Sequence, residues 1–413
     1  MNNIEIPIDR LSAELEELSR LSDAPAPAVT RVLYTKADLQ ARRFLKQLCL
    51  EAGLHVREDA IGNFFARWPG TDESLPAVGT GSHTDAIPHS GMYDGTVGVL
   101  GGLEALRALK ASGFLPRRSI ELLMFTSEEP TRFGIGCVGS RGLSGAITSD
   151  KLANLRDSEG QRLDDVRRGA GFSGDLATVV LPGDHYSAFV ELHIEQGPIL
   201  ERENLPIGVV AAIAAPAALV VKLEGEGGHA GAVLMPVRKD ALCAAAEIVL
   251  AVEAAARGTG SPDAVATTGV CNVHPGAINS VPSQVELRID VRDISLAARD
   301  ASVAAIRQSI AEVSTRRGVK ALVETLSVDP PATMAPTVVT AIESACRRLA
   351  LPFKSMVSRA YHDSLFMAHV FPTGMIFIPC RGGVSHRPDE YASPAAIEKG
   401  VKVLAEALRI LAE

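Results

Sequence analysis

The stretch that most constrains this chain is residues 81–94, Gly-Ser-His-Thr-Asp-Ala-Ile-Pro-His-Ser-Gly-Met-Tyr-Asp. The apolar run before it, 75–80, predicts a short buried strand, and the longer run after it, 96–109, predicts a helix. His83 and Asp85 therefore lie at the carboxyl end of a strand, where open α/β sheets bind ligands. Because side chains alternate along a strand, these two point the same way.

This spacing allows His83 to bind a metal ion while Asp85 orients it from behind, and Asp94 arrives from the following loop. Taken alone, a His-x-Asp pair at a strand end is more often a surface polar pair. Other polar residues of the chain distinguish between a metal site and a surface pair.

Composition narrows the class of protein. A chain of 413 residues exceeds a usual single core, so we expect two domains. A net charge of −8 without a basic cluster argues against a nucleic-acid partner. The six cysteines form no Cys-x-x-Cys pair and are interpreted as small buried residues in a reducing compartment. With no signal-peptide pattern and no run long enough to cross a bilayer, we expect a cytoplasmic protein without a membrane partner.

The order of elements predicts an α/β protein with a largely parallel sheet. A helix over 96–112 separates the first strand from a buried strand over 119–126, and another strand covers 188–194. From about residue 216 the order becomes strand–helix–strand–strand–helix–strand, which is the ferredoxin-like pattern. We therefore predict a mostly parallel-sheet catalytic domain with an inserted ferredoxin-like (α+β) domain. The expected boundaries are 1–214 and 329–413 for the first domain and 215–328 for the second.

Polar residues gather where the predicted strands end. Adjacent carboxylates such as Glu128 and Glu129 repel each other, and a cation relieves the repulsion, although a solvated acidic turn is an equal alternative. A strand histidine such as His193 is more often a structural group. The full set of metal-ligand candidates is His83, Asp94, Glu129, His193 and His386. Imidazole and carboxylate together suit Zn²⁺ and its first-row relatives.

Two ions close together need a shared carboxylate, and Asp94 is assigned to that place because it belongs to a loop. Glu128, which is then not a ligand, can act as the base towards a metal-bound water. The chemistry expected of this arrangement is hydrolysis of an unreactive carbonyl.

The chain resembles the dinuclear-metal aminoacylase/carboxypeptidase-like amidohydrolases, and within them the hydantoinase/carbamoylase branch. The resemblance runs from about residue 30 to the end. Its motifs are Gly-Ser-His-Thr-Asp at 81–85, Ser-Glu-Glu-Pro-Thr-Arg-Phe at 127–133, Glu-Leu-His-Ile-Glu-Gln-Gly-Pro at 191–198 and Ser-His-Arg-Pro at 385–388. It implies two divalent ions per subunit, Mn²⁺ or Zn²⁺. It also implies a homodimer formed through the inserted domain, which acts as a lid.

Carried over position by position, the resemblance implies one ion on His83, Asp94 and His193 and the other on Asp94, Glu129 and His386. It makes Glu128 the general base, lets Asp85 orient His83, and assigns Gln196, His229, Asn279 and Arg292 to substrate contacts. Alone, Arg292 is more simply read as a surface ion pair with Asp290 or Asp293, and Asn279 as a turn residue.

Local features indicate which member of the branch this is. The segment 358–364, Ser-Arg-Ala-Tyr-His-Asp-Ser, departs from the Ser-Gly-Ala-Gly-His-Asp form usual in carbamoylases and allantoate amidohydrolases and resembles ureidoglycolate amidohydrolases. Tyr361 would narrow the pocket, and Tyr361 and His362 would offer donors to a small ureido acid. The expected reaction is attack of a metal-bound hydroxide on the ureido carbonyl of ureidoglycolate, giving glyoxylate, ammonia and CO₂ in purine breakdown. Allantoate and N-carbamoyl-L-amino acids remain the alternative substrates.

Two other classes of protein fit the sequence less well. A nucleotide-binding oxidoreductase is disfavoured because the glycines at 95–102 do not follow Gly-x-Gly-x-x-Gly. A non-catalytic scaffold should have lost a ligand or the base, and this chain keeps them all.

Overall fold

The computed structural model describes residues 4–413, so the first three residues of the predicted catalytic domain lie outside the described part. The chain divides into two compact units. The first comprises the chain up to Ala211 together with Thr333–Ser358 and His362–Glu413. The second comprises Ala212–Ala332 and Arg359–Tyr361. Each unit is described by itself below.

The first unit is built on a nine-stranded sheet with the order β15-β8-β17-β7-β4-β6-β3-β2, and β16 pairs with β8. Its strands are β2 (His55–Glu58), β3 (Phe64–Trp68), β4 (Ala77–His83), β6 (Ile120–Phe125), β7 (Tyr186–Ile194), β8 (Ile207–Ile213), β15 (Ala332–Thr333), β16 (Phe353–Ser358) and β17 (Thr373–Ile378). The four central strands, β17, β7, β4 and β6, pair in parallel. The outer pairs β17–β8, β3–β6 and β2–β3 are antiparallel. The α/β class is confirmed, but the sheet is mixed rather than mostly parallel.

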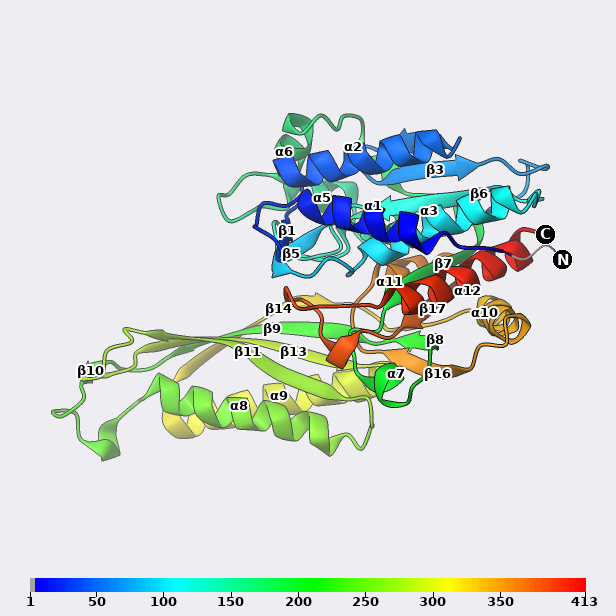
Figure 1. The fold of residues 1–413 in the computed structure, drawn as a ribbon. Helices are drawn as coiled ribbons and strands as arrows, with labels where there is room; N and C mark the ends of the chain where they lie inside the picture. Colours follow the sequence, from blue (N-terminus) through cyan, green and yellow to red (C-terminus); the bar gives the residue numbers. More distant parts are fainter. Residues whose placement is uncertain (1–3) are drawn as a thin grey trace. The chain divides into compact units, whose positions relative to one another are not determined.

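The central strands are short apolar runs because both faces of the sheet are covered. Along β6, Leu122 and Met124 belong to one hydrophobic core while Leu123 and Phe125 belong to another. Helices α1 (Ile8–Arg20), α3 (Thr96–Ala111), α10 (Pro336–Arg348) and α12 (Pro394–Ala412) contribute to the first core. Figure 1 shows α1, α3 and α12 side by side on that face.

The second core lies under α4 (Val138–Ser144), α5 (Ser149–Asn154) and α6 (Leu163–Gly169). The remaining elements of this unit are α2 (Lys36–Glu51), α7 (Ile199–Arg202), α11 (Asp363–Met367) and a small ladder of β1 (Val29–Arg31) with β5 (Ala86–Ser90). The sequence analysis did not predict β1, β5, β8 or β16. β1, β5 and β16 have short, partly polar sequences that carry little periodic signal. β8 differs, because it lies between β15 and β17 and its apolar run over 207–213 does indicate a strand.

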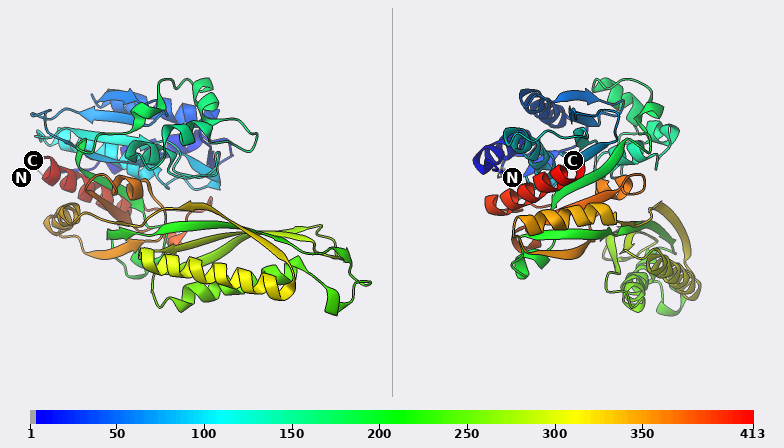
Figure 2. Two further views of the ribbon diagram at one scale, coloured as in Figure 1. Left: turned by 180° about the vertical axis from the view of Figure 1, so that it is seen from behind. Right: turned by 90° about the vertical axis from the view of Figure 1, so that its right-hand side faces the viewer.

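The second unit contains a four-stranded antiparallel sheet with the order β11-β13-β9-β14. Its elements follow the chain as β9 (Ala215–Glu224), α8 (Ala241–Gly258), β11 (Val265–His274), β13 (Gln284–Asp293), α9 (Leu296–Arg317) and β14 (Lys320–Val328). Alternate residues of β13, such as Leu287 and Ile289, are buried in one core with α8 and α9. Figure 2 shows both helices on the same face of this sheet. A second ladder, β10 (Gly228–His229) with β12 (Ser280–Val281), completes the unit.

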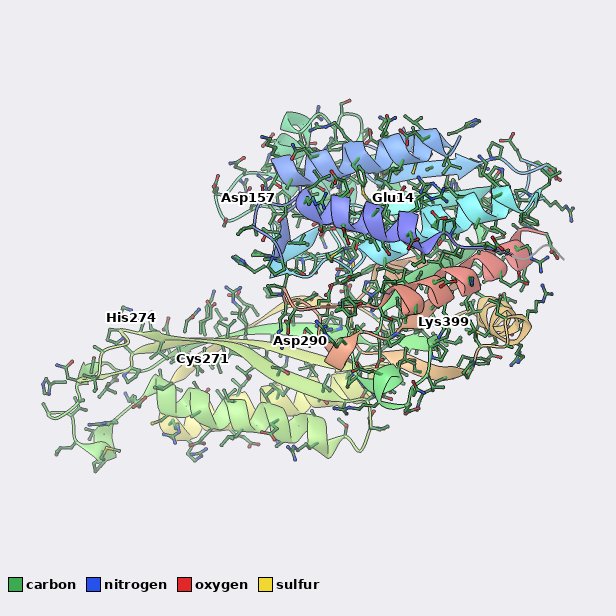
Figure 3. The ribbon with its side chains drawn as sticks, viewed as in Figure 1. Glu14, Asp157, Cys271, His274, Asp290 and Lys399 are labelled. Atoms are coloured by element: carbon green, nitrogen blue, oxygen red, sulfur yellow. The ribbon has the colours of Figure 1, made fainter. Side chains whose placement is uncertain are left out.

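All six cysteines are free thiols. Four are buried as expected, but Cys243 and Cys271 are exposed, which corrects the expectation that all six are small core residues. Cys271 lies on β11, which ends the sheet on one side (Figure 3). Among the described residues, no helix combines the length and apolar character needed to cross a membrane.

Candidate metal centre

The parallel centre of the sheet brings three polar strand ends to one edge. His83 is the last residue of β4 and is in register with Phe125 at the end of neighbouring β6. The chain then turns at Ser127, which has a left-handed φ of 55°, and presents Glu128 and Glu129. His193 lies near the end of β7, on the other side of β4. Strand order alone therefore explains why these side chains converge.

Asp94 reaches the same place from the loop after β5. Gly95 follows it with a φ of 67°, a left-handed conformation that favours glycine. A Cβ on Gly95 would overlap the His83 ring, so glycine is also needed for space. The Gly95 N–H donates to Nε2 of His193 at 3.2 Å. The turn before α3 thus places Asp94 between the two histidines.

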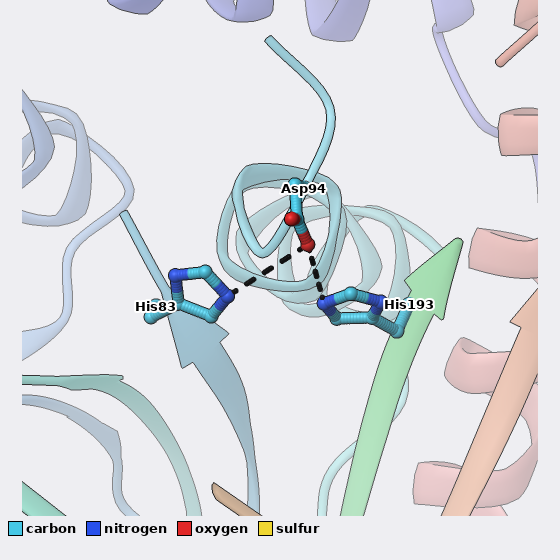
Figure 4. Close-up of side chains that lie close together, drawn as sticks. All are labelled: His83, Asp94 and His193. Carbon is cyan, nitrogen blue, oxygen red and sulfur yellow. Dashed lines mark ion pairs between the residues drawn. The ribbon is translucent and has the colours of Figure 1, made fainter. Parts of the chain in front are cut away.

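Oδ1 of Asp94 faces the two strand histidines. It lies 3.1 Å from Nε2 of His193 and 3.9 Å from Nε2 of His83 (Figure 4). Nδ1 of each ring is within hydrogen-bond distance of a backbone carbonyl, that of Asp85 for His83 at 3.0 Å and that of Ile194 for His193 at 2.9 Å. Because a carbonyl only accepts, Nδ1 of each ring carries a proton, and Nε2, on the side of Asp94, is the nitrogen available to a metal ion.

Oδ2 of Asp94 faces a second pair of groups. Nε2 of His386 lies 3.0 Å from Oδ2 and 3.2 Å from Oε1 of Glu129. His386 follows η3 (Arg381–Gly383) and has a left-handed φ of 60°, a strained conformation of the kind that collects at functional sites. The two oxygens of one aspartate therefore point to two separate sets of ligand atoms.

The site has too little positive charge to balance its buried carboxylates. Burial raises the pKa of Glu128 well above its usual value, and neighbouring Glu129 raises it further. Burial would likewise raise the pKa of Asp94, but hydrogen bonds with His193 and His386 hold it well below its usual value. Hydrogen bonds with Asp94 and Glu129 raise the pKa of His386 to about 10. Buried carboxylates in this arrangement are relieved by cations, and here protons on histidines partly fill that role.

These residues fit divalent ions by their donor chemistry. His83, Asp94 and His193 form one group, and Asp94, Glu129 and His386 form another, with the ligand atoms of each group within 4.8 Å of one another. Imidazole nitrogen and carboxylate oxygen without thiolate suit Zn²⁺, Mn²⁺ or Co²⁺. A third group, Glu191 with His193 and His362, fits less well. The Glu191 carboxylate already accepts the hydroxyls of Ser82 at 2.7 Å and Ser364 at 2.6 Å.

The carboxylate of Asp85 contributes more than the sequence predicted. It accepts the backbone N–H of Glu128 at 3.1 Å and of Glu129 at 3.0 Å, and its Oδ1 lies 3.7 Å from Nδ1 of His83. The group within hydrogen-bonding distance of His83 Nδ1 is instead the main-chain carbonyl of Asp85. The side chain therefore fixes the turn that carries both glutamates.

Several residues near the site were not singled out from the sequence. Asp363 is fully buried and accepts the hydroxyl of Ser140, and the Cys137 thiol lies 3.7 Å from Oε1 of Glu128. Glu390 is also buried and contacts the backbone of Asp94. The sequence hint for Glu390 was that it lies four residues after His386. Neither composition nor periodicity assigns a role to a residue at that position.

Of the predicted substrate contacts, Gln196 and His362 belong to the first unit with the metal-ligand candidates. Nε2 of Gln196 donates to both oxygens of Asp94 at 3.1 Å and to Oγ of Ser385 at 3.2 Å. Its Oε1 is buried with no hydrogen-bond partner among the described residues. His362 is buried with its ring centroid 4.5 Å from that of His193 and its Nε2 3.0 Å from Oγ of Ser358.

The other four predicted substrate contacts lie in the second unit. His229 and Asn279 are neighbours, because the N–H of Ala230 donates to the Asn279 carbonyl at 2.8 Å beside the β10–β12 ladder. Arg292 lies on β13 and forms the ion pair with Asp290, at 2.7 Å, that the simpler interpretation expected (Figure 3 labels Asp290).

Nη1 of Arg292 also donates to the carbonyl of Arg359 at 3.0 Å. The Tyr361 hydroxyl donates to Oδ2 of Asp329 at 2.6 Å. Both side chains are thus held by partners within the second unit.

Known proteins resemble this chain along most of its length. A ureidoglycolate hydrolase of Oryza sativa subsp. japonica is 54% identical over 405 residues, covering 97% of this chain and 84% of the relative. A ureidoglycolate hydrolase of Arabidopsis thaliana is 52% identical over 410 residues, covering 98% and 86%. The crystal structure of AtUAH in complex with glyoxylate matches with a TM-score of 0.92 and 51% identity, covering 99% of this chain and 98% of the other.

The family model for Peptidase family M20/M25/M40 matches residues 79–410. That range begins within β4, which carries His83, and ends within α12, so it includes every metal-ligand candidate. The resemblance drawn from the sequence is thereby confirmed at the level of the family. The chain belongs to peptidase family M20/M25/M40.

Proposed function

We propose that this protein is a metal-dependent amidohydrolase that cleaves the ureido C–N bond of ureidoglycolate. The observation that carries the proposal is the placement of Asp94, whose two oxygens face two separate sets of ligand atoms. Two relatives more than half identical to the chain are named ureidoglycolate hydrolases. Together they support two-ion hydrolysis as the chemistry and a small ureido acid as the substrate.

Two divalent ions fit the site. His83, Asp94 and His193 would hold one, and Asp94, Glu129 and His386 the other. When bound, such ions polarise a carbonyl oxygen and lower the pKa of water. Mn²⁺ and Zn²⁺ are both compatible with the donor set.

Glu128 is proposed to move the proton. It is buried, it is not part of either ligand group, and its Oε2 lies 3.9 Å from Nε2 of His83. Glu128 takes a proton from the attacking water as the water oxygen bonds to the ureido carbonyl carbon. It then gives that proton to the leaving nitrogen as the C–N bond breaks. The carbamate product decomposes to CO₂ and ammonia. The other product, 2-hydroxyglycine, loses ammonia to give glyoxylate.

Gln196 is proposed to recognise the ureido group. Its Oε1 is buried and accepts no hydrogen bond from residues 4–413, and its Nε2 is fixed on Asp94 and Ser385. A buried unpaired acceptor is costly, so a ligand N–H that satisfies it gains affinity. The proposal also keeps His362, and His229, Asn279, Arg292 and Tyr361 of the second unit, as substrate contacts from the sequence resemblance.

A homodimer formed through residues 215–328 is part of the proposal. The edge strand β14 exposes three apolar side chains, Leu322, Leu326 and Val328, each at least half exposed. Apolar side chains grouped on a sheet edge are typical of an interface. Light scattering of the purified protein should give twice the mass of one chain, and a monomer at micromolar concentration would contradict the dimer. The cytoplasmic location expected from the sequence stays part of the proposal.

The deciding experiment measures ammonia and glyoxylate release after metal-stripped protein is reconstituted with Mn²⁺. The substrates are ureidoglycolate, allantoate and an N-carbamoyl-L-amino acid. Turnover of ureidoglycolate well above the other two supports the proposed substrate. Preference for either of the others keeps the metal centre and replaces the substrate, and inactivity on all three with metal bound overturns the proposed activity.

A further inference from the structure

The side chain of Glu390 lies behind the candidate metal centre and has no part in the roles assigned so far. It is 5% exposed. Its Oε1 accepts the backbone N–H of Tyr93 at 2.9 Å and of Asp94 at 3.0 Å. Its Oε2 accepts the hydroxyl of Ser385 at 2.8 Å. One buried carboxylate therefore joins the segment that carries Asp94 to the segment that carries His386.

Both groups that Glu390 joins in this way contact or contain Asp94. Oγ of Ser385 lies 3.3 Å from Oδ2 of Asp94, on the side that faces His386. The backbone of Asp94 is held from behind by Glu390, while its side chain is directed forward at the candidate ligands. Fixing the amide fixes where the two carboxylate oxygens can lie.

The chain makes room for this carboxylate. A Cβ on Gly91 would overlap the side chain of Glu390. Glycine at this position thus allows the loop of residues 91–94 to approach Glu390 closely enough for both N–H groups to reach Oε1. The close approach is a second observation, independent of the hydrogen bonds, that the loop is built around this side chain.

The loop that carries His386 needs such support. His386 is 45% exposed and has a φ of 60°, which costs conformational energy in a residue other than glycine. Outside its contacts with Asp94 and Glu129, this loop is closed at its base by the Arg381 N–H, which donates to the Tyr391 carbonyl at 2.8 Å. Glu390 and Ser385 add a hydrogen bond between two side chains inside the loop.

We propose that Glu390 is a positioning residue that sets Asp94 and His386 at the separation a shared cation requires. The inference rests on the proposed metal centre and adds to it a residue that touches neither ion nor substrate. Burial and the neighbouring Asp94 raise the pKa of Glu390, and its three hydrogen bonds offset that rise only in part. The groups that donate these bonds all belong to, or are adjacent to, residues that face the centre.

The geometry offers a matched pair of variants. Glu390→Gln keeps Oε1 as the acceptor for both N–H groups, and its amide can donate to Ser385 Oγ. Glu390→Ala removes all three bonds. Glu104→Ala is the control, because Glu104 is a fully buried carboxylate of α3 whose partners are Arg10 and Arg107, away from the ligands.

The experiment titrates the metal-stripped full-length proteins with Co²⁺. It follows the visible absorption of bound Co²⁺ and counts the ions bound, so the readout does not depend on substrate. We expect Glu390→Ala to weaken one of two binding steps by roughly 10- to 100-fold, the usual effect of losing a group that orients a ligand. Glu390→Gln should stay within about threefold of the wild type, and Glu104→Ala should lower thermal stability without changing the titration.

Wild-type affinity and spectrum in Glu390→Ala would overturn the inference, as would equal losses in Glu390→Gln or in Glu104→Ala. If Glu390→Ala does not fold, Ser385→Ala decides, since it keeps the two bonds to Oε1 and removes the bond to Oε2. It also removes the contacts of Ser385 Oγ with Gln196 and Asp94, so Gln196→Ala, which leaves Glu390 and Ser385 in place, is its control. A weakened second step in Ser385→Ala supports the inference and an unchanged titration overturns it. Wild-type protein that binds fewer than two Co²⁺ ions overturns the proposed metal centre itself, which separates the two failures.

Discussion

The two sides of Asp94 are built in different ways. The strand side consists of His83 and His193, which lie at the ends of parallel strands and are 2% and 1% exposed. The loop side consists of Glu129, which follows a turn, and His386, which is 45% exposed. We call these the strand half and the loop half of the candidate centre.

The difference shows what each kind of scaffold has to supply. In the strand half, sheet register places the rings and backbone carbonyls fix their tautomers. In the loop half, side-chain carboxylates must hold the backbone, with Asp85 under Glu128 and Glu129 and Glu390 under Asp94. We therefore expect the strand half to bind its ion more tightly and the loop half to exchange its ion more readily.

Asp94→Asn should have the largest effect because Asp94 is the one residue shared by both halves. The neutral amide offers one oxygen in place of two and no charge, so both ions should be lost. Since bound ions supply several kcal/mol to such a reaction, the rate should fall by roughly 10⁴-fold or more. Metal analysis and steady-state kinetics on the same preparation check both. Retention of two ions would show that the halves do not meet at Asp94.

The sequence named candidate ligands in both halves but not the hydrogen bonds that support the loop half, for a physical reason. The apolar runs of β4, β6 and β7 are strong signals, and the residue at the end of each run is readily named. The supporting bonds of Asp85 and Glu390 link loops that are distant in sequence, so no local pattern predicts them. Tyr361 illustrates the same limit, because its hydrogen bond with Asp329 depends on the fold of the second unit. The ion pair of Arg292 with Asp290, only two residues away in the sequence, was expected.

The adjacent glutamates offer the next test, because only Glu129 belongs to a ligand group. Glu128→Gln should keep both ions and lose about 10³-fold in kcat, the typical contribution of a general base. Glu129→Gln should instead lose the ion of the loop half. Metal counts for the two variants distinguish these roles. A Glu128→Gln variant with normal kcat would remove Glu128 from proton transfer, and one that loses metal would make it a ligand.

His193→Ala and His386→Ala compare the halves directly. Removing the buried His193 ring should destabilise the metal-free fold by about 2 kcal/mol, since a buried side chain leaves a cavity. The His386 ring is 45% exposed and leaves little cavity, so its removal should destabilise the metal-free protein less than removal of His193 does, through loss of its ion pairs with Asp94 and Glu129. Each variant should retain one ion. Urea unfolding and metal analysis provide the measurements, and equal destabilisation by the two variants would contradict the distinction between strand and loop halves.

The smallest expected effect is on pH dependence. Hydrogen bonds with Asp94 and Glu129 raise the pKa of His386 to about 10. Burial alone would lower the pKa of His193, but its hydrogen bond with Asp94 raises that pKa to about 9. Because both values lie above that of an unfolded histidine, about 6.5, these pairs stabilise metal-free protein fully below about pH 6.5. The stabilisation is lost as the pH rises through about 9 and 10.

Bound ions occupy the same nitrogens in place of protons, and metal binding strengthens as the histidines deprotonate. The difference in melting temperature between metal-loaded and metal-free protein should therefore widen from about pH 6.5 upward. Thermal unfolding of both forms across this range measures the difference. In His386→Ala, the contribution of the loop half to this increase in the melting-temperature difference should disappear. The contribution of His193, near pH 9, should remain. A difference that is constant with pH would mean that protons and metal ions do not compete for these rings.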